Sequence, residues 1–141
     1  MAEDARYLGV ADVIALHQAI MERMGSPVAP LRDEGLLESA LMRPQAAAFY
    51  ERADLVRQAA LLTAGISQAQ AFVDGNKRVA FAAVYAFLYE NGLAYAGESL
   101  EVARAIEGLA TRTESLQAAT ARFEQWLRER ITATRPDLGS R

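Results

Sequence analysis

The sequence of 141 residues contains no cysteine and only one histidine, His17. Without cysteine, the chain cannot form disulfides, thiolate metal sites or a cysteine nucleophile. A single histidine excludes metal sites built from several histidines, and it leaves one candidate for a histidine base. No apolar stretch reaches the roughly 18 residues that a membrane-spanning helix needs, so no membrane partner is expected.

The chain also lacks a large excess of either charge, because fifteen basic and eighteen acidic residues give a net charge of -3. This balance argues against direct nucleic-acid binding, which needs a basic surface. The first residues, MAEDARY, are charged and lack the apolar core of a signal peptide. We therefore expect a cytoplasmic protein.

Alanine is abundant, with 29 residues, whereas valine, isoleucine and threonine together account for 19. Alanine favours helices and β-branched residues favour strands. No segment alternates apolar and polar residues for long enough to indicate a buried sheet. The length suits one domain. We predict a compact all-α domain over residues 1–131, followed by a flexible polar tail over 132–141.

Apolar residues recur at helical spacing in six segments. The predicted helices span about 10–24, from Asp33 to Pro44, 54–70, 76–90, from Ser99 onward, and 114–130. Pro44 is expected to end the second helix, because proline lacks an N–H and clashes with the preceding turn. Residues 45–52 fit a hairpin, a turn or more helix. The segment 76–90 is apolar on nearly every face, which predicts a central, buried helix.

The most informative stretch follows the third predicted helix and reads QAFVDGNKR from Gln70 to Arg78. Lys77 and Arg78 begin the most apolar helix, although the positive end of a helix dipole favours acids. A bound anion would resolve this conflict, since free N–H groups, two cations and Gly75 together suit an anion. Asp74 directly precedes this position, and a carboxylate beside bound phosphates is a natural Mg²⁺ ligand.

The same residues also allow a purely structural interpretation. Asp-Gly is a common turn, and the side chain of Asp74 or Asn76 can cap the following helix. Lys77 and Arg78 can extend into solvent or pair with acidic side chains elsewhere. Residue types and spacing alone leave both interpretations open.

The stretch resembles the signature His-x-Phe-x-Asp-Gly/Ala-Asn-Lys-Arg of the Fic/Doc superfamily, in its Doc (death-on-curing) toxin branch. Segments 31–44 (LRDEGLLESALMRP) and 87–92 (FLYENG) are also similar to Doc-branch sequences, and the resemblance covers roughly 7–97. It implies a compact, Fic-type helical domain in which the motif loop joins two central helices. The matching motif residues are Phe72, Asp74, Gly75, Asn76, Lys77 and Arg78.

The resemblance implies a toxin-type protein kinase that uses ATP and Mg²⁺. It would transfer the γ-phosphate to a hydroxyl of a translation factor similar to EF-Tu. Lys77 stands where Fic-type nucleotidyl transferases carry a second glycine, which speaks against nucleotidyl transfer as the alternative. Asp74 would hold Mg²⁺, Gly75, Asn76 and Lys77 would line an anion hole, and Lys77 and Arg78 would clamp the phosphates.

Doc toxins pair with an antitoxin whose disordered segment folds as a helix into a groove near the active site. The resemblance therefore implies a cognate antitoxin as a second protein partner. No inhibitory helix motif is recognisable within the chain itself, so control by a separate protein is expected.

The sequence departs from the family at its catalytic base, because Gln70 replaces the motif histidine. A glutamine amide cannot take a proton at neutral pH, and loss of a general base costs about 10²–10⁴ in rate. Phosphoryl transfer depends mainly on positioning and charge neutralisation. We therefore expect an attenuated kinase with Gln70 and Asp74 in its catalytic site. The alternative is a catalytically inactive Fic-fold module that binds a nucleotide or a partner.

Four further residues remain open at this stage. His17 fits a partly buried histidine satisfied by a local hydrogen bond, and only proximity to Asp74 would support a catalytic role. The resemblance suggests that Phe49 and Tyr50 lie in a flap for a target peptide, although ordinary packing fits equally well. Arg57 is expected in solvent, with the phosphates as a less favoured alternative.

Overall fold

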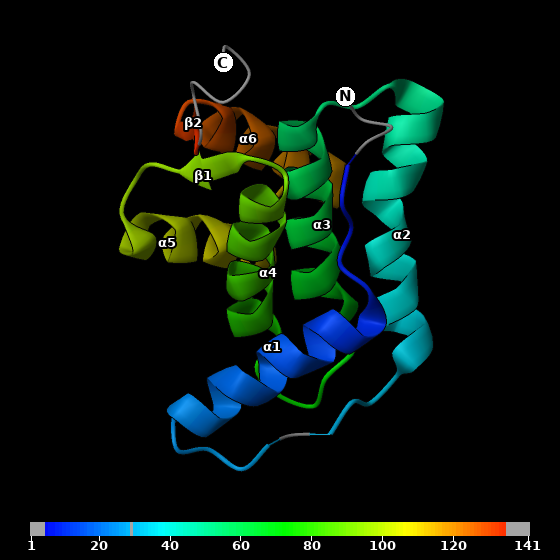
Figure 1. The fold of residues 1–141 in the computed structure, drawn as a ribbon, viewed down its shortest axis with the longest axis vertical. Helices are drawn as coiled ribbons and strands as arrows, with labels where there is room; N and C mark the ends of the chain where they lie inside the picture. Colours follow the sequence, from blue (N-terminus) through cyan, green and yellow to red (C-terminus); the bar gives the residue numbers. More distant parts are fainter. Residues whose placement is uncertain (1–4, 29, 135–141) are drawn as a thin grey trace.

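The computed structural model describes residues 5–28 and 30–134, and this part of the chain folds into six helices and two short strands (Figure 1). The predicted helical class is confirmed. None of the helices in the described part is long and apolar enough to cross a membrane. The elements are α1 (Val10–Arg23), α2 (Glu34–Glu51), α3 (Leu55–Ala69), α4 (Asn76–Glu90), β1 (Leu93–Tyr95), α5 (Ser99–Ala110), α6 (Leu116–Arg128) and β2 (Ile131–Ala133).

Helices α3 and α4 lie side by side at the centre of the fold, as Figure 1 shows. Helix α3 also packs against α2, α5 and α6. Helix α1 crosses the N-terminal end of α4 (Figure 1). Gly65 lets α2 approach α3 closely, because a Cβ at this position would lie 3.2 Å from the Cβ of Ala40. The predicted central position of α4 is confirmed. The motif loop therefore connects the two most enclosed helices of the molecule.

The helix starts follow from capping side chains. Asp33 accepts a hydrogen bond from the N–H of Leu36 at 3.1 Å, and Asp54 accepts one from the N–H of Arg57 at 3.0 Å. Such caps satisfy N–H groups that have no partner within the helix. Both predicted starts are therefore correct, and α4 has its predicted bounds.

The predicted end of the second helix at Pro44 is wrong, because α2 continues to Glu51. Pro44 lies on the buried stripe that also contains Leu37, Ala40, Leu41 and Ala47. Its missing N–H leaves the carbonyl of Ala40 without its helical donor, but burial of the stripe and the helix-forming alanines after Pro44 keep the segment helical. The open segment 45–52 is thus helical almost to its end.

The two strands form a small antiparallel sheet in which Leu93 pairs with Ala133 and Tyr95 with Ile131. This sheet joins the chain after α4 to the chain after α6. The sequence did not predict it. Thr132 and Ala133 belong to β2, whereas residues 135–141 of the expected flexible tail lie outside the described residues.

Candidate functional site

The loop between α3 and α4 is held in place by the segment that precedes α2. The N–H of Arg32 donates to the carbonyl of Ala71 at 2.6 Å, and the N–H of Val73 donates to the carbonyl of Pro30 at 3.2 Å. An isolated antiparallel bridge joins Leu31 and Phe72 between these contacts. The loop therefore begins as a short extended segment with its own backbone partners.

Asn76 closes the loop on itself. Its side-chain oxygen accepts from the N–H of Phe72 at 3.1 Å, and its side-chain nitrogen donates to the carbonyl of the same residue at 2.9 Å. Only 8% of Asn76 is exposed. Its side chain therefore fixes the loop, and the group that it offers to an anion is its backbone N–H. Its role in an anion hole stays a prediction.

The N-terminus of α4 has no cap. Gly75, at the cap position, has a left-handed backbone with φ of 87°, and the first turn contains no acidic residue. Among the described residues, no acceptor contacts the backbone N–H of Asn76, Lys77 or Arg78. Such unsatisfied N–H groups at the positive end of a helix dipole attract anions.

The two cations of this turn have different surroundings. The ammonium of Lys77 lies 2.8 Å from the carboxylate of Glu107 on α5, and both side chains are about half exposed. Arg78 is exposed, and its side chain makes no ion pair within the part of the chain that the structure describes. One motif cation is thus paired with protein, and the other remains available to a ligand.

These groups line one cavity of about 1020 Å³ between the motif loop, α4 and α5. The cavity brings together every residue that the sequence predicted for the site. Its remaining lining is mostly apolar and comes from the motif loop, α1, α4 and α5. The lining residues are Ile20, Gln70, Val73, Asp74, Gly75, Asn76, Lys77, Arg78, Phe81, Ala82, Tyr85, Ala103, Ile106 and Glu107.

Asp74 fits a magnesium ligand that acts together with phosphate. Its side chain is exposed at the cavity, and one carboxylate oxygen accepts the N–H of Gly75 at 2.8 Å. No group of three or more histidine or acidic side chains suited to a metal occurs in the described ranges. A lone carboxylate suits Mg²⁺ that takes its other ligands from phosphate and water.

Gln70 ends α3 in a left-handed conformation, with φ of 56° and ψ of 39°. The guanidinium of Arg32 donates to its backbone carbonyl. Its side-chain oxygen accepts from Asn76 at 3.4 Å, and its side-chain nitrogen donates to the carbonyl of Ser67 at 3.4 Å. Both side-chain bonds are long, so little energy holds the amide in this orientation.

His17 is buried on α1, with only 2% of its surface exposed. Its Nε2 lies 2.8 Å from the carbonyl oxygen of Asp74, and its ring stacks on Phe72 with centroids 3.9 Å apart. His17 is satisfied by a hydrogen bond as expected, but it is fully rather than partly buried, and its partner is not local. The partner is the backbone carbonyl of Asp74, 57 positions away, so His17 does lie close to Asp74. His17 thus approaches the backbone of Asp74 from within the core.

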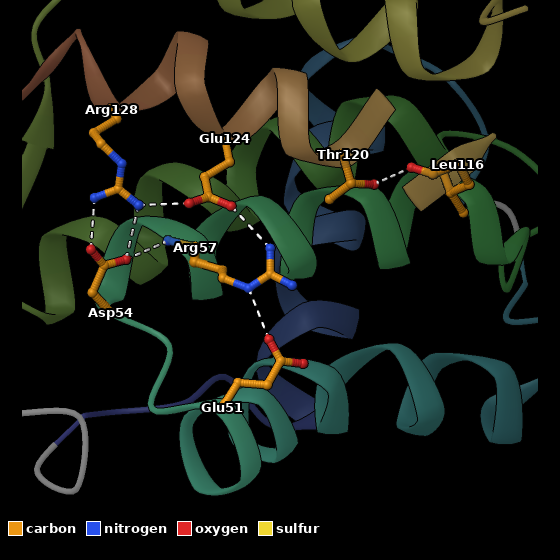
Figure 2. A network of polar contacts seen from close by, with 7 residues as sticks. All are labelled: Glu51, Asp54, Arg57, Leu116, Thr120, Glu124 and Arg128. Atoms are coloured by element: carbon orange, nitrogen blue, oxygen red, sulfur yellow. Dashed lines mark hydrogen bonds and ion pairs between the residues drawn. The ribbon is translucent and has the colours of Figure 1, made fainter. Parts of the chain in front are cut away.

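The remaining candidates lie at the opposite end of α3. Phe49 and Tyr50 belong to the last turns of α2 and are largely exposed. Neither open alternative describes them, because they form an exposed helix end and not a flap or part of the packed core. Arg57 lies between Glu51 and Glu124, in the ionic network of Figure 2 that also contains Asp54 and Arg128. Arg57 therefore links α2 to α6 through two ion pairs. It is neither the solvent-exposed arginine that was expected nor a residue that contacts the motif.

Sequence reasoning missed Glu107 and the apolar wall of the cavity. Both depend on where α5 packs, and an amphipathic pattern does not specify the neighbour of a helix. The alternation of charge along α5 gives no sign that one of its acids meets the motif lysine.

Comparison with known proteins agrees with the motif. The model of the Fic/DOC family matches residues 7–88, which include α1 to α3, the motif loop and most of α4. The protein named Toxin Doc from Mycolicibacterium smegmatis (strain ATCC 700084 / mc(2)155) is 40% identical to the chain over 98 residues. This alignment covers 64% of the chain and 73% of that protein.

Proposed function

Because the chain belongs to the Fic/DOC family, we propose that it is a Doc-type toxin that transfers the γ-phosphate of ATP to a hydroxyl of an EF-Tu-like translation factor. Family members are generally transferases with nucleotide substrates. The observation that carries the proposal is the uncapped start of α4, which opens into the cavity beside Lys77 and Arg78.

The phosphates would bind where these donors meet. The free N–H groups of Asn76, Lys77 and Arg78 supply neutral donors, and the side chain of Arg78 supplies a charged one. Lys77 would exchange its contact with Glu107 for a phosphate oxygen, since an exposed ion pair is weak. Charge neutralisation of this kind is the main requirement of phosphoryl transfer.

Asp74 would hold the magnesium ion through its carboxylate. A magnesium ion held there would supply positive charge beside the phosphates of ATP. The hydrogen bond from Gly75 occupies one oxygen of Asp74, which orients the carboxylate at the mouth of the anion site. Replacing Asp74 with alanine should therefore remove most of the effect of Mg²⁺ on nucleotide binding.

Gln70 would contact the attacking hydroxyl without accepting its proton. An amide oxygen can accept a hydrogen bond and orient the hydroxyl, but the proton has to leave to solvent. The reaction would then be slow rather than absent, because a loose transition state depends less on a base. Attenuation is thus part of the proposed function.

Phosphate transfer to purified EF-Tu tests this proposal. The protein is incubated with ATP labelled in its γ-phosphate, with Mg²⁺ and EF-Tu, and label on EF-Tu is measured over time. We expect slow transfer by the natural chain, faster transfer by Gln70→His and none by Asp74→Ala. Label from the α-phosphate on EF-Tu would indicate nucleotidyl transfer instead.

Gln70 also favours a second candidate, a catalytically inactive module that binds a nucleotide or a partner. This module would use the same cavity and transfer nothing. Calorimetric titration with ATP, with and without Mg²⁺, combined with the labelling assay separates the two. Binding without transfer, together with transfer by Gln70→His, would identify a disabled kinase.

We also propose a cognate antitoxin as a partner, by analogy with the toxin that the chain resembles. The cavity has an apolar wall in which Phe81 and Tyr85 are partly exposed, and these rings would receive apolar side chains of a helix that folds on binding. A peptide from the antitoxin should gain helical circular dichroism when the protein is added. The variant Phe81→Glu, at a partly exposed position of this wall, should weaken this binding.

A further inference from the structure

We propose that His17 is a positioning residue for the carboxylate of Asp74. Its Nε2–H fixes the carbonyl of Asp74 and thereby sets the orientation of the Asp74–Gly75 peptide. The inference rests on the proposed function, in which Asp74 holds Mg²⁺ beside the phosphates of ATP. It assigns to the single histidine of the chain a role in the site without direct contact with the substrate.

The direction of the hydrogen bond follows from the acceptor. A carbonyl oxygen only accepts, so the proton between His17 and Asp74 resides on Nε2 of the imidazole. The ring cannot turn freely, because it is stacked on Phe72 with an angle of 13° between the planes. Phe72 is itself fixed by the two bonds to Asn76. The imidazole donor is thus held in one orientation.

Both sides of the Asp74–Gly75 peptide are constrained. Its carbonyl receives the imidazole N–H, and its N–H donates to the carboxylate of Asp74 at 2.8 Å. Rotation of this peptide would break both bonds together. The carboxylate that we assign to Mg²⁺ is therefore connected to His17 through one peptide group.

Gly75 makes this arrangement possible. A Cβ at Gly75 would lie 3.1 Å from Nε2 of His17 and 3.1 Å from Sδ of Met21. Any side chain at this position would crowd the imidazole and Met21, so the loop or these neighbours would have to shift. Glycine thus serves both the left-handed backbone and the close approach of the histidine.

Two substitutions of His17 distinguish the contribution of its N–H donor from the contribution of its aromatic ring. His17→Phe keeps an aromatic ring against Phe72 and removes the donor. His17→Gln places an amide N–H within reach of the same carbonyl. Tyr7→Phe serves as the matched control, because it also removes one hydrogen bond from an aromatic side chain, to Gln58 at 2.8 Å, away from the cavity.

The first measurement is the gain in ATP affinity that Mg²⁺ produces, from calorimetric titrations with and without the metal. Loss of a group that orients a metal ligand costs about 10–100-fold in metal affinity. We expect His17→Phe to reduce the gain by about tenfold, while ATP affinity without Mg²⁺ changes little. His17→Gln should recover part of the gain, and Tyr7→Phe should leave it unchanged.

The second measurement uses the protein without nucleotide and therefore does not depend on the proposed function. Hydrogen exchange of the Gly75 amide should become at least several-fold faster in His17→Phe, and nitrogen NMR should place the imidazole proton on Nε2. An unchanged exchange rate or an unchanged Mg²⁺ gain in His17→Phe would overturn the positioning role. Absence of any Mg²⁺ gain in the natural chain would instead overturn the proposed function, together with the part of this inference that depends on it.

Discussion

The ammonium of Lys77 lies 2.8 Å from the carboxylate of Glu107, which joins the motif to α5 across the cavity. An acid of the protein thus occupies the position that a phosphate oxygen would take in the proposed ATP complex. Both side chains are about half exposed, so solvent weakens the attraction. Under the proposed function, this contact would compete with ATP without blocking its binding.

Replacement of Glu107 with glutamine should therefore raise the affinity for ATP. An exposed ion pair contributes about 0.2–1 kcal/mol, which corresponds to a gain of up to about fivefold. Titration calorimetry measures this change, and Glu101→Gln on the same helix is the control for loss of one negative charge. Equal gains in both variants would attribute the effect to overall charge rather than to Lys77.

Replacement of Gln70 with histidine should accelerate phosphate transfer. A positioned base contributes about 10²–10⁴-fold, and the long hydrogen bonds of the Gln70 amide indicate that little binding energy is lost by removing it. The rate is measured from label on EF-Tu. Gln68→His adds a histidine two positions away on α3 and should leave the rate unchanged.

Replacement of Gly75 with alanine should destabilise the protein by about 2 kcal/mol or more. A left-handed backbone costs other residues about 1–2 kcal/mol, and crowding in a packed region costs about 1–3 kcal/mol. The added Cβ would lie 3.1 Å from His17. Urea unfolding measures the loss. Gly92→Ala is the control, since Gly92 has φ of 79° but no heavy atom within 4 Å of an added Cβ; equal losses would contradict crowding at Gly75.

Stability at acid pH should depend on Asp54. The side chain of Arg128 hydrogen-bonds to its carboxylate and holds the pKa of Asp54 below its ordinary value (Figure 2). A lowered pKa stabilises the folded state above the unfolded pKa of about 4, and this contribution is lost as the pH falls through the folded value. Over half of the Asp54 side chain is exposed, so the effect should stay below about 1 kcal/mol.

The variant Asp54→Asn isolates this charge effect, because asparagine also caps helices well. The free energy of unfolding, measured by urea titration between about pH 6 and pH 2, should decrease less steeply in the variant than in the natural chain. Identical pH profiles would show that the ion pair with Arg128 contributes nothing to acid stability.

Local signals predicted most of the helices. Asp54 caps α3 and the apolar run after Asn76 forms α4, because both features act within a few residues. The prediction that Pro44 ends a helix was wrong, because burial of its helix face outweighs the lost backbone hydrogen bond. The strands around Ala94 and Thr132 have three residues each, which is too short for an alternating pattern.

The candidate site was predictable where it is contiguous in sequence. Residues from Gln70 to Arg78 meet in one cavity because a single loop and the first turn of α4 carry them. Glu107 contacts the first turn of α4 from α5, and His17 contacts the loop from α1, and only packing brings them there. The chemical type of a residue indicates its potential partners, but not which of several distant partners it meets.

The backbone of Gln70 is left-handed, and Arg32 donates to its carbonyl, so the backbone and not the glutamine side chain fixes this position. Another side chain could therefore replace glutamine here during evolution. Glutamine and histidine codons share their first two bases and differ only in the third. A single-nucleotide change would therefore place an imidazole at the mouth of the cavity, on a loop that other residues already hold. Under the proposed function, the gene for a restrained toxin lies one point mutation from the gene for a more potent one.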